Sequence, residues 1–223
     1  QTMQCLEAGR HVLCEKPMAT NSKDCEQMLD VAQKNHRQLT IGHMLRYSPA
    51  MLGVRQWIQS GRFGKPQSLN IKFHYYLPES KRSWAFRPEF SGGGALIDAG
   101  IHCIDLARFL IGDPVIVQQS RMDFIRSSGV EQLAECSFTV AGVPASLNVR
   151  SDASYASNLT VDVADGEILV NSFAACWDCV ALKYVSFKNS SLNHEVIVDV
   201  SGTYAQQLET FANQILNREM NYS

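Results

Sequence analysis

A lysine that directly follows a short apolar run is the first candidate for chemistry in this sequence. Val12–Cys14 is too short for a helix and is typical of a buried strand, and Glu15, Lys16 and Pro17 come next. Pro17 fixes its own φ and pushes Lys16 toward an extended backbone. Open α/β sheets bind ligands at the carboxyl ends of their strands, and buried lysines are rare. Lys16 is therefore a candidate ligand-contacting residue, with an ordinary surface lysine as the alternative.

A second candidate site lies on a predicted helix at residues 92–112. The segment starts with three glycines, and a Gly-Asp-Pro sequence ends it. Its apolar residues cover nearly the whole circumference, which is typical of a buried helix. The polar exceptions Asp98, His102 and Asp105 fall at i, i+4 and i+7, so they share one stripe. Buried groups of this kind need a partner or a wet cleft. The stripe indicates either a structural Asp–His pair or a general acid/base histidine oriented by a carboxylate.

Together these two segments resemble the Gfo/Idh/MocA oxidoreductases, a family that includes glucose–fructose oxidoreductase and inositol 2-dehydrogenase. The resemblance rests on Glu-Lys-Pro after an apolar strand and on the sequence GGGALIDAGIH at residues 92–102. It extends over essentially the whole chain. Further agreement lies at residues 41–49, 61–66 and 84–88.

The resemblance implies hydride transfer between NAD or NADP and a sugar, polyol or related hydroxy compound. Such a transfer needs two carbons held close while the hydroxyl proton is removed. A histidine that titrates near neutral pH suits the proton step, and a lysine can stabilise negative charge on the substrate oxygen. The family pattern gives these roles to His102 and Lys16, with Asp98 shaping the site. It implies cofactor contacts at Glu15, Lys16, Pro17 and His43, and substrate contacts at Arg46, Tyr47 and Trp84, although Arg46 also fits a surface charge beside a helix.

One family feature is missing from this sequence. A glycine-rich G-x-G-x-x-G loop between a strand and a helix does not occur, and residues 92–94 cannot replace it because no strand of a βαβ unit precedes them. The chain also starts at Gln1 within what reads as a helix. We therefore expect a longer protein, in which roughly three further βα units, at about 30 residues per βαβ unit, hold the adenosine and pyrophosphate. The nicotinamide end and the substrate cleft are expected here.

The expected fold is α/β followed by α+β. Residues 1–46 are predicted to be the carboxyl-terminal part of a Rossmann-type NAD(P)-binding domain. Residues 47–223 are predicted to form an α+β domain for substrate binding and oligomerisation, with a large, mostly antiparallel sheet and helices on one face. The short buried strands are expected at residues 12–14 and 39–41, and the helices at 22–36, 49–60, 92–112 and 203–216. The strands of the large sheet are expected at residues 67–75, 115–124, 131–140, 145–151, 159–163, 167–171, 180–187 and 195–200, with an Asp-Gly hairpin turn at 164–167.

Composition narrows the class of protein. A net charge of −2 gives no support for a nucleic-acid or membrane partner, and no apolar run is long enough to span a bilayer. Seven cysteines, mostly within apolar runs, favour core thiols in a reducing, cytoplasmic compartment. The one C-x-x-C, at Cys176 and Cys179, lacks a second pair or nearby histidines, so no metal site is expected.

Three functions remain open at this point. The first is an NAD(P)-dependent dehydrogenase or reductase that acts on CH–OH groups. The second is an NAD-dependent glycoside hydrolase, which some relatives of the family are. The third is a non-catalytic regulator that senses a sugar or dinucleotide. Lys16, Asp98 and His102 together favour an enzyme. The open face of the large sheet commonly serves subunit contacts in the family, so a homodimer or homotetramer is expected.

Overall fold

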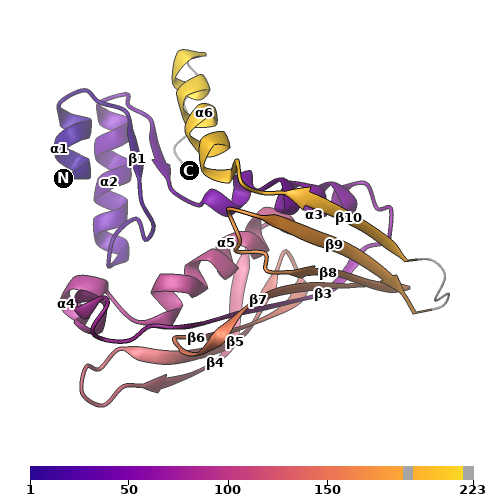
Figure 1. Cartoon of the computed structure of the whole chain (residues 1–223). Helices are drawn as coiled ribbons and strands as arrows, with labels where there is room; N and C mark the ends of the chain where they lie inside the picture. The colour runs from indigo at the N-terminus through magenta and orange to yellow at the C-terminus, as the bar shows by residue number, and fades with distance from the viewer. Residues whose placement is uncertain (188–192, 218–223) are drawn as a thin grey trace.

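The computed structural model describes residues 1–187 and 193–217, which form a small N-terminal unit, a large curved sheet and a last helix beside that unit (Figure 1). The elements in chain order are α1 (Thr2–Glu7), β1 (Val12–Cys14), α2 (Ser22–Lys34), β2 (Leu39–Ile41), the 3₁₀ turn η1 (Met44–Tyr47), α3 (Pro49–Gln59), β3 (Pro66–Tyr76), the 3₁₀ turn η2 (Ser83–Phe86), α4 (Pro88–Ser91), the π-helical turn η3 (Leu96–Gly100), α5 (Ile101–Leu110), β4 (Val115–Phe124), β5 (Glu131–Val140), β6 (Val143–Arg150), β7 (Asp152–Val163), β8 (Gly166–Asn171), β9 (Cys179–Ser186), β10 (His194–Asp199) and α6 (Thr203–Leu216).

The N-terminal unit has the predicted α/β character. β1 and β2 pair in parallel, at the bounds expected from the sequence, and α1 and α2 lie beside them (Figure 1). The Asn21 side chain caps α2 by accepting a hydrogen bond of 2.9 Å from the Asp24 backbone N–H. A small core of Leu6, Met28 and Leu39 holds the unit together.

The large sheet has the strand order β10-β9-β8-β7-β3-β6-β5-β4. Only the β3–β6 pair is parallel among its pairings, so the predicted mostly antiparallel sheet is confirmed. Helices α3 and α5 lie on one face, where Leu69 and Ile71 of β3 join the main core (Figure 1). The other face is polar: Asn148 donates a 2.7 Å hydrogen bond to Glu135 and lies 2.6 Å from Nε2 of His74.

The predicted helix at residues 92–112 begins later than expected. The glycines are not helical: the chain enters through the π turn η3, and α5 follows. Gly92 has φ +75°, and a Cβ on Gly94 would lie 1.9 Å from the carbonyl oxygen of Glu131. The Glu131 carboxylate also accepts a 3.0 Å hydrogen bond from the Leu96 N–H. The glycines therefore allow the start of this helix to lie directly against β5.

The predicted hairpin at residues 164–167 also differs in detail. Val163 pairs with Gly166, so the turn consists of Ala164 and Asp165, and Gly166 already belongs to β8. Gly166 is required for another reason, because its Cβ would lie 2.2 Å from the Val185 carbonyl oxygen. β7 starts at Asp152 rather than at residue 159, since its polar first half pairs with the end of β3. The expected strands at residues 115–124 and 131–140 have the observed bounds of β4 and β5.

The last helix, α6, returns to the N-terminal unit. It contacts η1, and Gln38 donates to Gln214 across 3.4 Å, although these residues are 176 positions apart (Figure 1). The first and last parts of the chain are thus packed together above the sheet. Within residues 1–187 and 193–217, no helix combines the length and apolarity needed to cross a bilayer.

Replacing Gly94 by Ala tests the close approach of the glycine run to β5. Since the new Cβ would meet a backbone oxygen at 1.9 Å, β5 or η3 must move, and we expect the free energy of unfolding to fall by roughly 3 kcal/mol or more. Urea denaturation measures the change. Gly202→Ala is the control, because nothing lies within 4 Å of that Cβ; at a helix N-cap it should cost no more than about 1 kcal/mol. Equal losses would contradict the interpretation.

Candidate active site

An ion pair between Lys16 and Asp98 joins the N-terminal unit to the π turn η3, which lies against the large sheet. Lys16 follows β1, and its Nζ donates to the Asp98 carbonyl oxygen at 2.7 Å and to Oδ1 at 3.0 Å. Asp98 lies in the π turn η3, and both side chains are partly buried. Two residues that are 82 positions apart are therefore held in one site, as the family pattern implies.

Two further side chains complete the surroundings of Asp98. The Tyr75 hydroxyl donates to Oδ2 at 2.9 Å, and Nη1 of Arg82 lies 3.7 Å from the same oxygen. Burial opposes ionisation of Asp98, but the charge of Lys16 and the hydrogen bonds outweigh it, so its pKa lies below the usual value. Burial, and next the charge of Asp98, raise the pKa of Tyr75, which keeps its proton.

Sequence reasoning did not assign Tyr75 to the site. The alternation of apolar residues along β3 identifies it as an inward-facing residue, which is correct. The Tyr75 ring packs against the edge of the core, 6.1 Å from the Phe73 ring centroid, while its hydroxyl reaches Asp98. A hydroxyl on the final inward residue of the strand was the available signal.

His102 is buried next to this network. It is 6% exposed, and its Nδ1 has no hydrogen-bond partner among the described residues. Its ring centroid lies 6.4 Å from that of Phe73 and 6.4 Å from that of His43. Burial, and next the charge of Lys16, lower the pKa of His102 to about 3. The structure thus holds a neutral imidazole, and not the histidine titrating near neutral pH that we expected.

Asp105, the third residue of the polar stripe, binds Arg46. Nε of Arg46 lies 3.0 Å and 2.9 Å from the two carboxylate oxygens, and Nη2 lies 2.7 Å from Oδ1. His43 Nδ1 lies 3.7 Å from Oδ2, and burial lowers the pKa of His43. Asp105 is 7% exposed, so this pair ties η1 to α5 from within. Arg46 thus pairs with a buried carboxylate and lines neither cavity, which fits neither of the two roles expected from the sequence, a substrate contact or a surface charge beside a helix.

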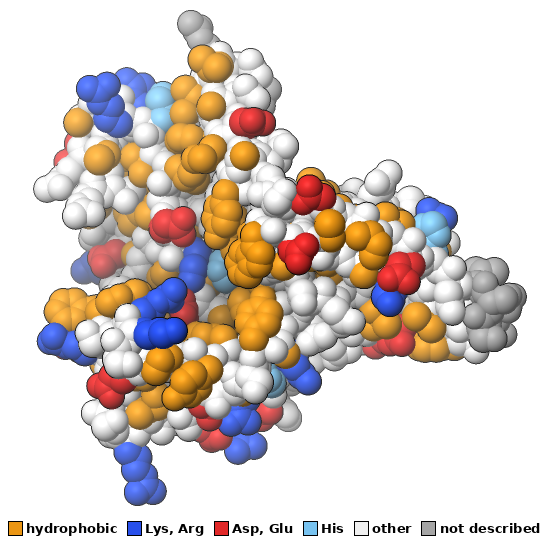
Figure 2. All heavy atoms as spheres, viewed as in Figure 1, with side chains coloured by type: hydrophobic (Ala, Val, Ile, Leu, Met, Phe, Trp, Pro, Cys, Tyr) orange, Lys and Arg blue, Asp and Glu red, His pale blue; other side chains and the backbone are white. Residues whose placement is uncertain are grey.

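Two adjoining cavities meet at the Lys16–Asp98 pair, and Tyr75 and Arg82 line both of them. The larger, of ≈ 670 Å³, contains His102. The smaller, of ≈ 430 Å³, is lined by Pro17 and Trp84. Figure 2 shows basic, acidic and histidine side chains together near the centre of this face, with hydrophobic side chains around them.

Two of the remaining predicted residues, Glu15 and Tyr47, lie outside the linings of both cavities. Glu15 is exposed and accepts a 3.3 Å hydrogen bond from the Lys16 N–H, outside the linings of both cavities. Tyr47 also lines neither cavity, and burial raises its pKa. Within the described residues, no group of three or more His, Cys, Asp or Glu side chains is placed to hold a metal ion.

Comparison with known proteins places this chain in a family. A profile of the GFO/IDH/MocA C-terminal domain matches residues 51–169, and one of an oxidoreductase family with an NAD-binding Rossmann fold matches residues 1–43. The chain belongs to the Gfo/Idh/MocA oxidoreductases. Both the resemblance read from the sequence and the fold class are confirmed.

Individual Gfo/Idh/MocA proteins are similar over parts of the chain. A 1,5-anhydro-D-fructose reductase from Ensifer adhaerens is 34% identical over 113 residues, which are 51% of this chain and 34% of the reductase. A D-xylose 1-dehydrogenase [NADP(+)] from Haloarcula marismortui is 27% identical over 91% of this chain and 56% of its own length. A 3-ketoreductase from Actinomadura kijaniata, solved with NADP and TDP-benzene, superposes with a TM-score of 0.89 at 21% identity, over 99% of this chain and 67% of that one. The chain thus spans about a third to a half of the curated relatives' length.

The burial of His102 predicts how stability depends on pH. Below pH 6.5 this histidine binds a proton in the unfolded chain, whereas in the folded chain it stays neutral down to about pH 3. The free energy of unfolding should therefore decrease as the pH is lowered through that window, by up to about 1.4 kcal/mol per pH unit from this residue. His102→Gln should flatten the dependence, measured by urea denaturation between about pH 6 and 4. His36→Asn, which removes a solvent-exposed histidine, is the control. A slope that is the same in wild type and His102→Gln would contradict the burial effect.

Proposed function

We propose that the protein carrying this chain is an NAD(P)-dependent oxidoreductase, which transfers a hydride between nicotinamide and the CH–OH carbon of a sugar, polyol or related hydroxy compound. The observation that carries the proposal is the meeting of Lys16, Asp98 and His102 at one cavity. Family membership and the names of the relatives, which include sugar reductases and dehydrogenases, support it.

The chain's own residues divide the work in this proposal. His102 is neutral at pH 7, and its imidazole lines the cavity, where it can accept the proton of the substrate hydroxyl. An imidazole with so low a pKa holds the hydroxyl proton only in passing and releases it to water in the cavity, while Lys16 supplies the charge that stabilises the developing alkoxide. Asp98 orients Lys16 through two contacts, and Tyr75 holds the second carboxylate oxygen. Arg46 acts through Asp105, by positioning α5.

The residues fit a nicotinamide cofactor. The cationic Nζ of Lys16 lies at the carboxyl end of a parallel strand, where dinucleotides bind in this fold class. NAD or NADP, when bound, would accept or donate the hydride. Lys16 and Pro17 would hold its nicotinamide end, with Glu15 and His43 beside them, and Trp84 is a candidate substrate contact from the smaller cavity. The Actinomadura ketoreductase solved with NADP supports this choice.

We further propose a homodimer or homotetramer that assembles through the open face of the large sheet, in a reducing compartment such as the cytoplasm. The face carries side-chain amides and hydroxyls, such as that of Ser146, which donates a 2.8 Å hydrogen bond to Asn70. All seven cysteines lie in the described part of the chain and are free thiols. Both features support the proposal.

Replacing Lys16 by Met, or His102 by Asn, tests the catalytic roles. In the intact protein that carries this chain, kcat for a sugar substrate should fall by roughly 100-fold or more, because each change removes charge stabilisation or proton transfer. Cofactor binding, measured by NAD(P)H fluorescence, shows whether the site survives. Lys23→Met on the exposed face of α2 is the control. Turnover close to wild type with cofactor bound would rule out the assignment, and sugar release without net cofactor reduction would favour the glycoside hydrolase.

Replacing Asn70 by Arg tests the assembly. Asn70 is exposed at the centre of the open face, and a bulky cation there should halve the mass measured by light scattering, or lower it further. Gln33→Arg, which adds the same charge on α2, should leave the mass unchanged. An unchanged mass in Asn70→Arg would place the subunit contact elsewhere.

A further inference from the structure

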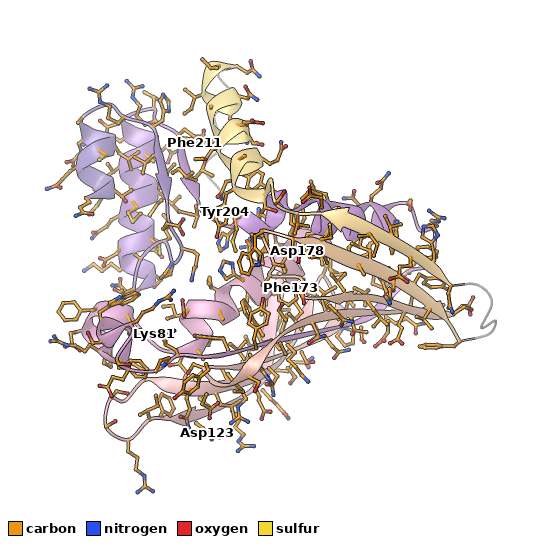
Figure 3. The ribbon with its side chains drawn as sticks, in the orientation of Figure 1. Lys81, Asp123, Phe173, Asp178, Tyr204 and Phe211 are labelled. Atoms are coloured by element: carbon orange, nitrogen blue, oxygen red, sulfur yellow. The ribbon has the colours of Figure 1, made fainter. Side chains whose placement is uncertain are left out.

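Four aromatic side chains surround the opening of the larger cavity. Tyr76 is 71% exposed, Tyr155 55%, Trp177 75% and Tyr204 50%, and all four line the cavity that contains His102. They come from β3, β7, the segment between β8 and β9, and α6. Figure 3 labels Tyr204 at the start of α6, above the sheet. We call these four residues the aromatic rim.

The rim begins one ring beyond the proposed catalytic histidine. Phe73 lies between them, with its centroid 6.4 Å from that of His102 and 6.3 Å from that of Tyr155. Phe173 supports Phe73 from behind at 5.6 Å and is fully buried. If one ring of a ligand lay at His102, the next ring of that ligand would therefore be within reach of an aromatic surface.

The rim is distinguished by its location, because other aromatic residues such as Phe90 and Phe124 are as exposed but line neither cavity. Exposed apolar groups that gather at a cleft mark binding sites. The cavity of ≈ 670 Å³ is in the range of about 300–1,000 Å³ that is typical of small-molecule sites.

We propose that the larger cavity takes a glycoside of at least two rings. The reacting sugar lies at Lys16 and His102, and the second ring stacks on the aromatic rim. A pyranose has an apolar C–H face that packs on the negative face of an aromatic ring, while the tyrosine hydroxyls and the Trp177 N–H can reach its hydroxyl groups. This inference names the substrate class of the proposed oxidoreductase and so rests on that function.

The charges around the cavity favour a neutral second ring over an anionic group. Three cations line it, but Lys16 and Arg82 both contact Asp98, at 3.0 Å and 3.7 Å. Lys81 is the one lining cation without an ion pair among the described residues. One flexible surface lysine is a weak anion site compared with four aromatic rings.

Calorimetric titration of the intact protein with glucose, maltose, cellobiose and 4-nitrophenyl β-D-glucoside tests the proposal. At least one two-ring probe should bind roughly tenfold more tightly than glucose. Trp177→Ala and Tyr204→Ala should remove that gain and leave the dissociation constant of glucose unchanged. The matched control is Phe124→Ala, since Phe124 is 56% exposed but lines neither cavity. A gain with the disaccharides assigns the rim to a second sugar, and a gain with the nitrophenyl glucoside alone assigns it to a planar aglycone.

Three results would overturn the inference. In the first, no two-ring probe binds more tightly than glucose. In the second, the rim variants weaken glucose as much as the two-ring probes. In the third, Lys81→Met removes the gain, which would mean that the outer part of the cavity recognises an anionic group. Binding needs no turnover, so these results are independent of whether the protein reduces NAD(P). Tight binding of a two-ring probe without redox activity would contradict only the proposed function and not this inference.

Discussion

The ion pair of Lys16 with Asp98 is the contact on which the rest of the site depends. It joins the end of a parallel strand in the N-terminal unit to a π turn above the large sheet. Partly buried charges of this kind are stable only when each has a partner. Tyr75 and Arg82 satisfy the second oxygen of Asp98, so one carboxylate organises the residues between the two cavities.

The position of Asp98 is in turn set by how closely its helix approaches the sheet. Gly94 lies against the backbone of Glu131, whose carboxylate binds the first N–H of η3. Further along, Asp105 binds Arg46 of η1. The helix that carries His102 is thus held to the sheet at one end and to the connection between the two units at the other. Both restraints use polar groups that would be costly to bury alone.

These restraints explain why a neutral imidazole lies beside a charged lysine. His102 is buried beside Phe73 and His43, which favours its uncharged form, while Lys16 forms an ion pair with Asp98. The Lys16 ammonium and the neutral His102 imidazole are then separate groups in one cavity. The aromatic rim lines the same cavity and adds exposed apolar surface to it.

The sequence by itself determined the elements and the residue types of the site. Period-two alternation located β3, and an apolar run before Glu-Lys-Pro located β1 and Lys16. Only the tertiary structure decided which groups meet. Arg46 binds Asp105 and Tyr75 binds Asp98 across 59 and 23 positions, and the low pKa of His102 comes from burial by distant elements. Local periodicity reports which face a residue occupies, whereas contacts and desolvation depend on how those faces pack.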